Sequence, residues 1–144
     1  MLTDYFIKQG HVLVSDDKVA TWWEHGSYFA APSHPNHRPY RKFEDLGYRV
    51  ENFNPGPRTV AAIYALQRVD AEADVEIETV TGHRKFAVVR PGYLFDFGFL
   101  REKRLKYMGE LLGEVGVYRV SVPWDTKRLQ VTHDCIVRHV TKNN

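Results

Sequence analysis

The chain has 144 residues, 43% of them hydrophobic and 13% aromatic, so it is long and apolar enough to bury a core of its own. Its single cysteine, Cys135, excludes an internal disulfide and a cysteine-rich zinc site. No stretch reaches the roughly 18 apolar residues of a membrane span, and the N-terminal segment is too polar for a secretory signal. We therefore expect a soluble, cytoplasmic, single domain over residues 1–144, with no membrane partner.

The net charge of +2 is unevenly distributed. Residues 1–57 carry a net charge of −1 and residues 58–80 carry −3, whereas residues 81–144 carry +6, from 12 Lys and Arg against 6 Asp and Glu. A basic segment of this kind is typical of a surface that meets phosphates, although charged runs also serve as ordinary solvated faces.

The N-terminal part predicts short strands and a loop. Residues Tyr5–Lys8 and His11–Val14 are expected to pair, and Val19–Phe29 is expected to form a further strand. Three prolines predict an irregular loop over Ala31–Arg41, because proline removes a backbone donor and restricts the preceding residue. A short helical turn is expected over Arg41–Gly47.

The middle of the chain predicts three more strands. Thr59–Val69 fits a helix through its alanines and a strand through its β-branched residues, and the strand is favoured. Alternation over Val75–Thr79 predicts a strand with carboxylates on a solvated face, and Lys85–Arg90 is expected to follow as another strand after a turn.

The next segment changes its period. Aromatic residues alternate over Gly92–Phe99 and predict a strand with its rings on one side. From Leu100 the apolar residues recur at helical spacing, which predicts the main helix at about residues 100–112.

A closing hairpin is expected from Val117–Trp124 and Leu129–Val140. The predicted fold class is therefore α+β, with a mainly antiparallel, bent or partly closed sheet, one main helix and one or two short helices.

Cations flank the aromatic strand, and together they form the first candidate site. Cations bind phosphates and aromatic rings stack on bases, so this combination predicts binding of nucleic acid or a phosphorylated small molecule, without catalysis and without a cofactor. The alternative is that the rings belong to the core and the cations to the solvated surface. The candidate binding residues are Arg84, Lys85, Arg90, Tyr93, Phe95, Arg101, Lys103, Arg104 and Lys106.

The seven histidines do not predict a metal site. His34 and His37 lie in the proline-rich loop without neighbouring carboxylates or thiols to complete the ligands. His133, Cys135 and His139 would share one strand face of the expected hairpin, either as core residues or as part of a site.

Two tripeptides place a histidine and a hydroxyl two residues apart: His25-Gly26-Ser27 and His139-Val140-Thr141. On a strand, each pair would share one face. The pattern resembles the two-histidine phosphoesterases. The resemblance implies phosphodiester hydrolysis, with His25 and His139 as acid and base and with Ser27 and Thr141 holding phosphate oxygens.

A third possibility is a protein partner. Trp22, Trp23, Tyr28 and Phe29 lie close together in sequence and would form an aromatic anchor if they are exposed, since tryptophan and tyrosine are favoured at interface centres.

Overall fold

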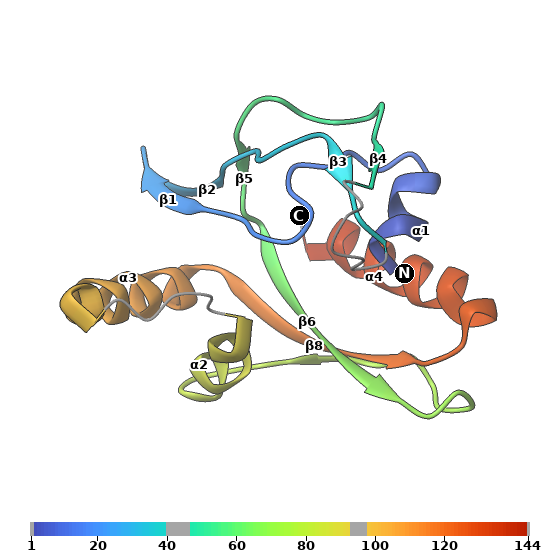
Figure 1. Cartoon of the computed structure of the whole chain (residues 1–144). Coiled ribbons are helices and arrows are strands. Elements are labelled where there is room, and N and C mark those ends of the chain that lie inside the picture. Colours follow the sequence, from blue (N-terminus) through green and yellow to red (C-terminus); the bar gives the residue numbers. More distant parts are fainter. Residues whose placement is uncertain (1, 40–46, 93–97, 144) are drawn as a thin grey trace. The chain divides into compact units, whose positions relative to one another are not determined.

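Figure 1 shows the computed structural model of the chain, which describes residues 2–39, 47–92 and 98–143. The chain divides into two compact units. Unit 1 comprises Met1–Val60 with Thr126–His133, and unit 2 comprises Ala61–Asp125 with Asp134–Asn144. The single domain over residues 1–144 stays a prediction.

The fold class is α+β, as predicted. The described residues form four α-helices and three small sheets, in which most strand pairs are antiparallel. The expected sheet is therefore divided into three parts. No helix in the described ranges has the length and apolar composition needed to cross a bilayer.

Unit 1 holds two of the sheets. One has the strand order β1-β2-β5, and the other pairs β3 with β4. Leu13, Tyr28 and Val50 are buried within the unit. The elements of this unit are α1 (Leu2–Lys8), β1 (Thr21–Glu24), β2 (Ser27–Ala30), β3 (Asn36–His37), β4 (Tyr48–Arg49) and β5 (Arg58–Thr59).

The first predicted strand is wrong, because Leu2–Lys8 forms helix α1. Lys8 lies one turn after Asp4, and their side chains form an ion pair of 2.8 Å. Asp4 is in the first turn and Lys8 in the last, which also complements the helix dipole. The ion pair at helical spacing thus outweighs the short strand pattern. Of the predicted strand His11–Val14, Leu13 forms a single isolated β-bridge with Phe53.

The predicted strand over Val19–Phe29 is a hairpin instead. Strands β1 and β2 pair antiparallel, with Glu24 opposite Ser27, so His25 and Gly26 form a two-residue turn. Both have positive φ angles, 48° for His25 and 79° for Gly26. This is the backbone of the turn that matches the twist of two antiparallel strands, and glycine adopts it without steric cost.

Unit 2 is built on a three-stranded sheet of order β6-β8-β7. Strands β6 (Ala62–Val69) and β8 (Gly116–Pro123) run parallel and side by side (Figure 1), whereas β7 (Ile77–Thr79) pairs antiparallel with β8. The strands predicted over Thr59–Val69 and Val75–Thr79 are therefore confirmed in their C-terminal parts, and the strand predicted over Val117–Trp124 is confirmed over nearly its whole length. Strand β8 lies in the middle, and its Val117 and Val120 are almost fully buried.

Two helices pack beside this sheet. The predicted main helix is confirmed as α3 (Arg101–Glu114), with Met108, Leu111 and Leu112 buried. Met108 and Leu112 form a core cluster with Val80 and Val117. The expected strand over Lys85–Arg90 is wrong: Arg84–Val89 is helix α2, since the helical turn brings Phe86 and Val89 onto the same cluster.

The second strand of the closing hairpin is also wrong, because Leu129–Asn143 is helix α4. The same apolar residues satisfy both periods. At helical spacing Leu129, Thr132 and Ile136 share a side, and these three are buried, whereas Val131 is 49% exposed. The 3.6-residue period is therefore the one the protein uses.

Two predicted elements fall partly or wholly outside the described residues. These are the helical turn over Arg41–Gly47 and most of the aromatic strand over Gly92–Phe99, including Tyr93 and Phe95. The described part of the proline-rich loop is irregular apart from β3. Short 3-10 turns at Arg90–Gly92, Gly98–Leu100 and Thr126–Arg128 complete the chain.

Candidate functional site

Seven of the nine predicted binding residues lie on or next to α2 and α3 of unit 2. Arg84 and Lys85 begin α2, and Arg90 follows its end. The other four, Arg101, Lys103, Arg104 and Lys106, occupy the first two turns of α3. Tyr93 and Phe95 lie outside the described residues.

Arg104 has an interaction within the protein, and the partners of three further cations, Arg84, Lys85 and Lys106, are known in detail. The Arg84 guanidinium is 3.0 Å from the carboxylate of Glu78, which also lies 3.3 Å from Arg119. Lys106 and Glu110 form a loose i,i+4 pair at 3.9 Å.

Lys85 has the most specific role of the three. Its Nζ donates to the carbonyl oxygens of Leu112 at 2.6 Å and of Val115 at 3.2 Å. These carbonyls lie at the C-terminal end of α3, where they lack helical donors and where the helix dipole is negative. Lys85 therefore caps α3, which is a structural role that its sequence context did not indicate.

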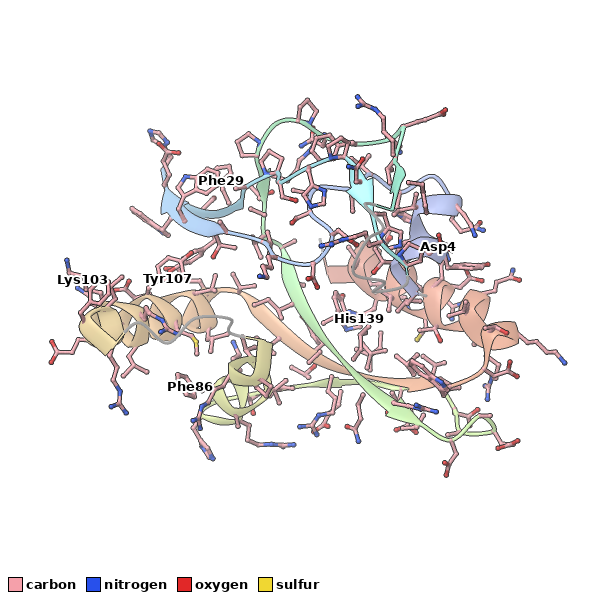
Figure 2. The ribbon with its side chains drawn as sticks, viewed as in Figure 1. Asp4, Phe29, Phe86, Lys103, Tyr107 and His139 are labelled. Atoms are coloured by element: carbon pink, nitrogen blue, oxygen red, sulfur yellow. The ribbon has the colours of Figure 1, made fainter. Side chains whose placement is uncertain are left out.

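The start of α3 presents a different kind of surface. Arg101 and Lys103 are exposed and make no ion pair with any described residue, and the same holds for Arg90. Figure 2 labels Lys103, whose side chain extends from the first turn of the helix. Phe99, in the turn that leads into α3, is 84% exposed. We call Phe99, Arg101, Lys103 and Arg104 the α3 basic surface.

The two histidine–hydroxyl motifs do not have the strand geometry expected of them. His25 lies in the hairpin turn and Ser27 begins β2. His139 and Thr141 lie on α4, where residues two apart point to nearly opposite sides, so the expected common strand face is wrong. The Thr141 hydroxyl donates to the carbonyl of Val137 one turn earlier.

His139 belongs to an aromatic cluster of unit 2. Its Nδ1 and the Tyr64 hydroxyl share a hydrogen bond of 2.8 Å, and its ring lies edge-on to Tyr118 at 4.4 Å. Burial, with a smaller contribution from Tyr118, raises the pKa of Tyr64. The catalytic roles of His25, Ser27, His139 and Thr141 stay predictions, and the motifs belong to different units.

The aromatic anchor residues lie on the β1–β2 hairpin of unit 1. Trp22 stacks on Phe29 at 5.6 Å between centroids, and the Trp22 indole donates to Glu24 at 3.1 Å. Tyr28 is buried at 4% exposure, whereas Trp23 is 55% exposed. Only part of the predicted anchor is thus available to a protein partner.

A buried histidine network in unit 1 was missed by the sequence analysis. His37, only 3% exposed, donates from Nδ1 to Asp16 at 2.5 Å, and the second oxygen of Asp16 accepts from the backbone N–H of Arg38 at 3.0 Å. No described residue pairs with Nε2 of His37. The carboxylate fixes the ring and its tautomer, as in many functional histidines. Asp16 and His37 are 21 residues apart, so no local spacing pointed to the pair.

The same network continues through Tyr48. Its ring lies edge-on to His37, and its hydroxyl donates to Asp4 at 2.7 Å. Burial and the hydrogen bond to Asp4 raise the pKa of Tyr48 to about 12. Burial opposes the charge of Asp4, but the hydrogen bonds from Lys8 and Tyr48 outweigh it and lower the pKa of that carboxyl.

Within the described ranges, no group of three or more histidine, cysteine or acidic side chains is arranged to hold a metal ion. The comparisons with known proteins identify no relative: no family model matches the chain, and no curated protein or solved structure resembles it significantly.

Proposed function

We propose that this protein binds single-stranded nucleic acid through the α3 basic surface. The observation that carries the proposal is Phe99, a large apolar ring that is 84% exposed directly before the cations of α3. An exposed ring provides a face on which a base stacks, and adjacent cations neutralise the flanking phosphates. Arg101 and Lys103 supply those cations and have no ion-pair partner among the described residues.

The position of the cations also favours an anionic ligand. The first turn of a helix is the positive end of its dipole, so Arg101, Lys103 and Arg104 are mildly unfavourable for the folded chain alone. A phosphate at this end would be attracted by the cations and by the helix dipole together. The electrostatic repulsion at this helix end is unfavourable in the free protein, and a bound phosphate would relieve it.

The partners of Arg84, Lys85 and Lys106 narrow the proposed site. Their positive charges already meet Glu78, the carbonyls of α3 and Glu110. The proposed binding site therefore comprises the α3 basic surface and not the whole predicted segment from Arg84 to Lys106.

The proposal is tested by the binding of fluorescent single-stranded oligonucleotides at about 50 and 200 mM salt, where phosphate contacts weaken measurably. Removing one phosphate contact, by Arg101→Ala or Lys103→Ala, is expected to reduce the slope of log affinity against log salt by about 0.7. Phe99→Ala is expected to lower affinity by about 5- to 150-fold, the equivalent of one lost stack of about 1 to 3 kcal/mol, without changing that slope.

Arg138→Ala is the matched control, since it removes one exposed cation of α4 outside the α3 basic surface. Its salt slope should equal that of the wild type. Affinity that is independent of salt, or equal losses in the Arg101 and Arg138 variants, would contradict binding at the α3 basic surface. Equal affinity for duplex and single strands would contradict the stacking role of Phe99.

A further inference from the structure

Two histidines of unit 1 that are far apart in sequence meet directly. The Nε2 atoms of His11, which follows α1, and His133, on α4, are 2.9 Å apart, an ordinary hydrogen-bond distance. They are separated by 122 positions. The contact therefore ties the N-terminal segment to the first half of the last helix.

Aromatic side chains of α1 surround the pair. Phe6 lies 4.9 Å from the His11 ring and 4.7 Å from the His133 ring, measured between centroids. Tyr5 lies edge-on to His133 at 5.5 Å. The two imidazole centroids are 5.0 Å apart while their Nε2 atoms are 2.9 Å apart, so the rings meet end to end and direct these nitrogens at each other.

This geometry requires a single proton between the two nitrogens. One Nε2 carries the proton and donates, and the other must be unprotonated to accept. If both imidazoles are protonated, two N–H donors and two positive charges face each other in a partly buried place. Burial and the charge of His133 lower the pKa of His11, in agreement with this conflict.

We propose that the His11–His133 pair is a pH-sensitive contact that holds α1 against the start of α4 near neutral pH and releases it in acid. Near neutral pH the single shared proton closes the contact. Below the lowered pKa of His11, protonation of both rings breaks the contact and exposes the apolar side of α1, including Phe6.

Tyr5 of α1 also faces the ring of His133. A third imidazole of unit 1, His37, lies against Tyr48. The second anchor of α1 is the hydrogen bond from Tyr48 to Asp4, whose carboxyl has a lowered pKa and stays ionised in weak acid. A loss of protection in acid that is absent from a His133 variant with His37 intact therefore reports on the histidine pair.

The test is hydrogen–deuterium exchange of the amides in residues 2–11 at about pH 7.5 and about pH 4.5, with the lower value well below the ordinary histidine pKa because the pKa of His11 is lowered, and with correction for intrinsic exchange rates. The wild type should lose protection at the lower pH, because two protonated imidazoles repel each other. His133→Ala should show the low protection at both values.

His133→Gln is the decisive variant, because a neutral amide donates to unprotonated His11 and accepts from protonated His11. Its protection should stay high at both pH values. His25→Gln, which changes an exposed histidine in the hairpin turn, serves as the control and should behave like the wild type. Equal wild-type protection at both pH values, or a loss in His133→Gln as large as that of the wild type, would overturn the proposal.

Discussion

Replacing Lys85 with methionine tests whether this cation stabilises the fold or binds a ligand. Methionine keeps the apolar stem of lysine but removes the ammonium that caps α3. The carbonyls of Leu112 and Val115 then lose donors at 2.6 and 3.2 Å. Both residues are buried, at 6% and 5% exposure, so water replaces the lost donors poorly.

The expected cost follows from these two contacts. A hydrogen bond from a charged donor contributes about 1.5 to 3 kcal/mol, and the longer contact to Val115 contributes less than the shorter one. We therefore expect Lys85→Met to lower the free energy of unfolding by about 2 to 3 kcal/mol, a figure that already includes the loss of the cation at the negative end of the helix dipole. For a chain of this length the melting temperature should fall by roughly 5 to 10 °C.

Urea unfolding followed by circular dichroism measures this change as a lower midpoint at constant m-value. Lys103→Met is the matched control, because Lys103 is an exposed lysine of α3, the helix that Lys85 caps, and it should stay within about 0.5 kcal/mol of the wild type. Lys85→Met should retain its affinity for oligonucleotides, whereas Lys103→Met should not. If Lys85→Met is as stable as the wild type, the cap contributes nothing and the reasoning is wrong.

Three further changes test the first unit. Gly47→Ala should destabilise the chain by more than about 2 kcal/mol in urea unfolding, because φ is +73° and a Cβ would clash with the backbone carbonyl of His37; a neutral effect would contradict this backbone. His25→Asn should raise the thermal midpoint slightly, by the equivalent of about 0.5 kcal/mol, since asparagine tolerates the positive φ of 48° better than histidine does; a lower midpoint would argue against the turn. The raised pKa of Tyr48, about 12 when folded and 10 in the unfolded chain, means that its contribution to stability is present below pH 10 and is lost as pH rises towards 12. Alkaline unfolding should show this loss in the wild type and less of it in Tyr48→Phe, and identical profiles would remove the phenol from the explanation.

The parts of the fold that the sequence predicted are those with one dominant period. In α3 the residues Met108, Leu111 and Leu112 recur only at helical spacing, and β8 has buried valines that suit a strand. In Leu129–Val140 the apolar residues fit both the strand period and the helical period, and the predicted strand is wrong. The ambiguity was in the sequence itself, and packing of Thr132 and Ile136 resolves it.

The contacts of the polar side chains were harder to predict, because their partners are distant in sequence. Lys85 looked like a phosphate ligand until the carbonyls 27 and 30 residues away were placed beside it. The His11–His133 and His37–Asp16 contacts likewise join segments 122 and 21 residues apart. Composition and spacing indicate which residue types are present, whereas tertiary contacts decide which charges remain available.

The order of the strands in the sheet of unit 2 has a consequence for protein synthesis. Strands β6 and β7 both pair with β8 and not with each other. Each β6 residue pairs with a residue 54 positions later in the sequence, as Ala62 does with Gly116. During translation neither strand has a partner in this sheet until β8 has left the ribosome. Such distant pairing slows folding and leaves strand edges open to other chains in the meantime. A nascent chain that stops before Gly116 therefore holds two of the three strands but can form none of the sheet.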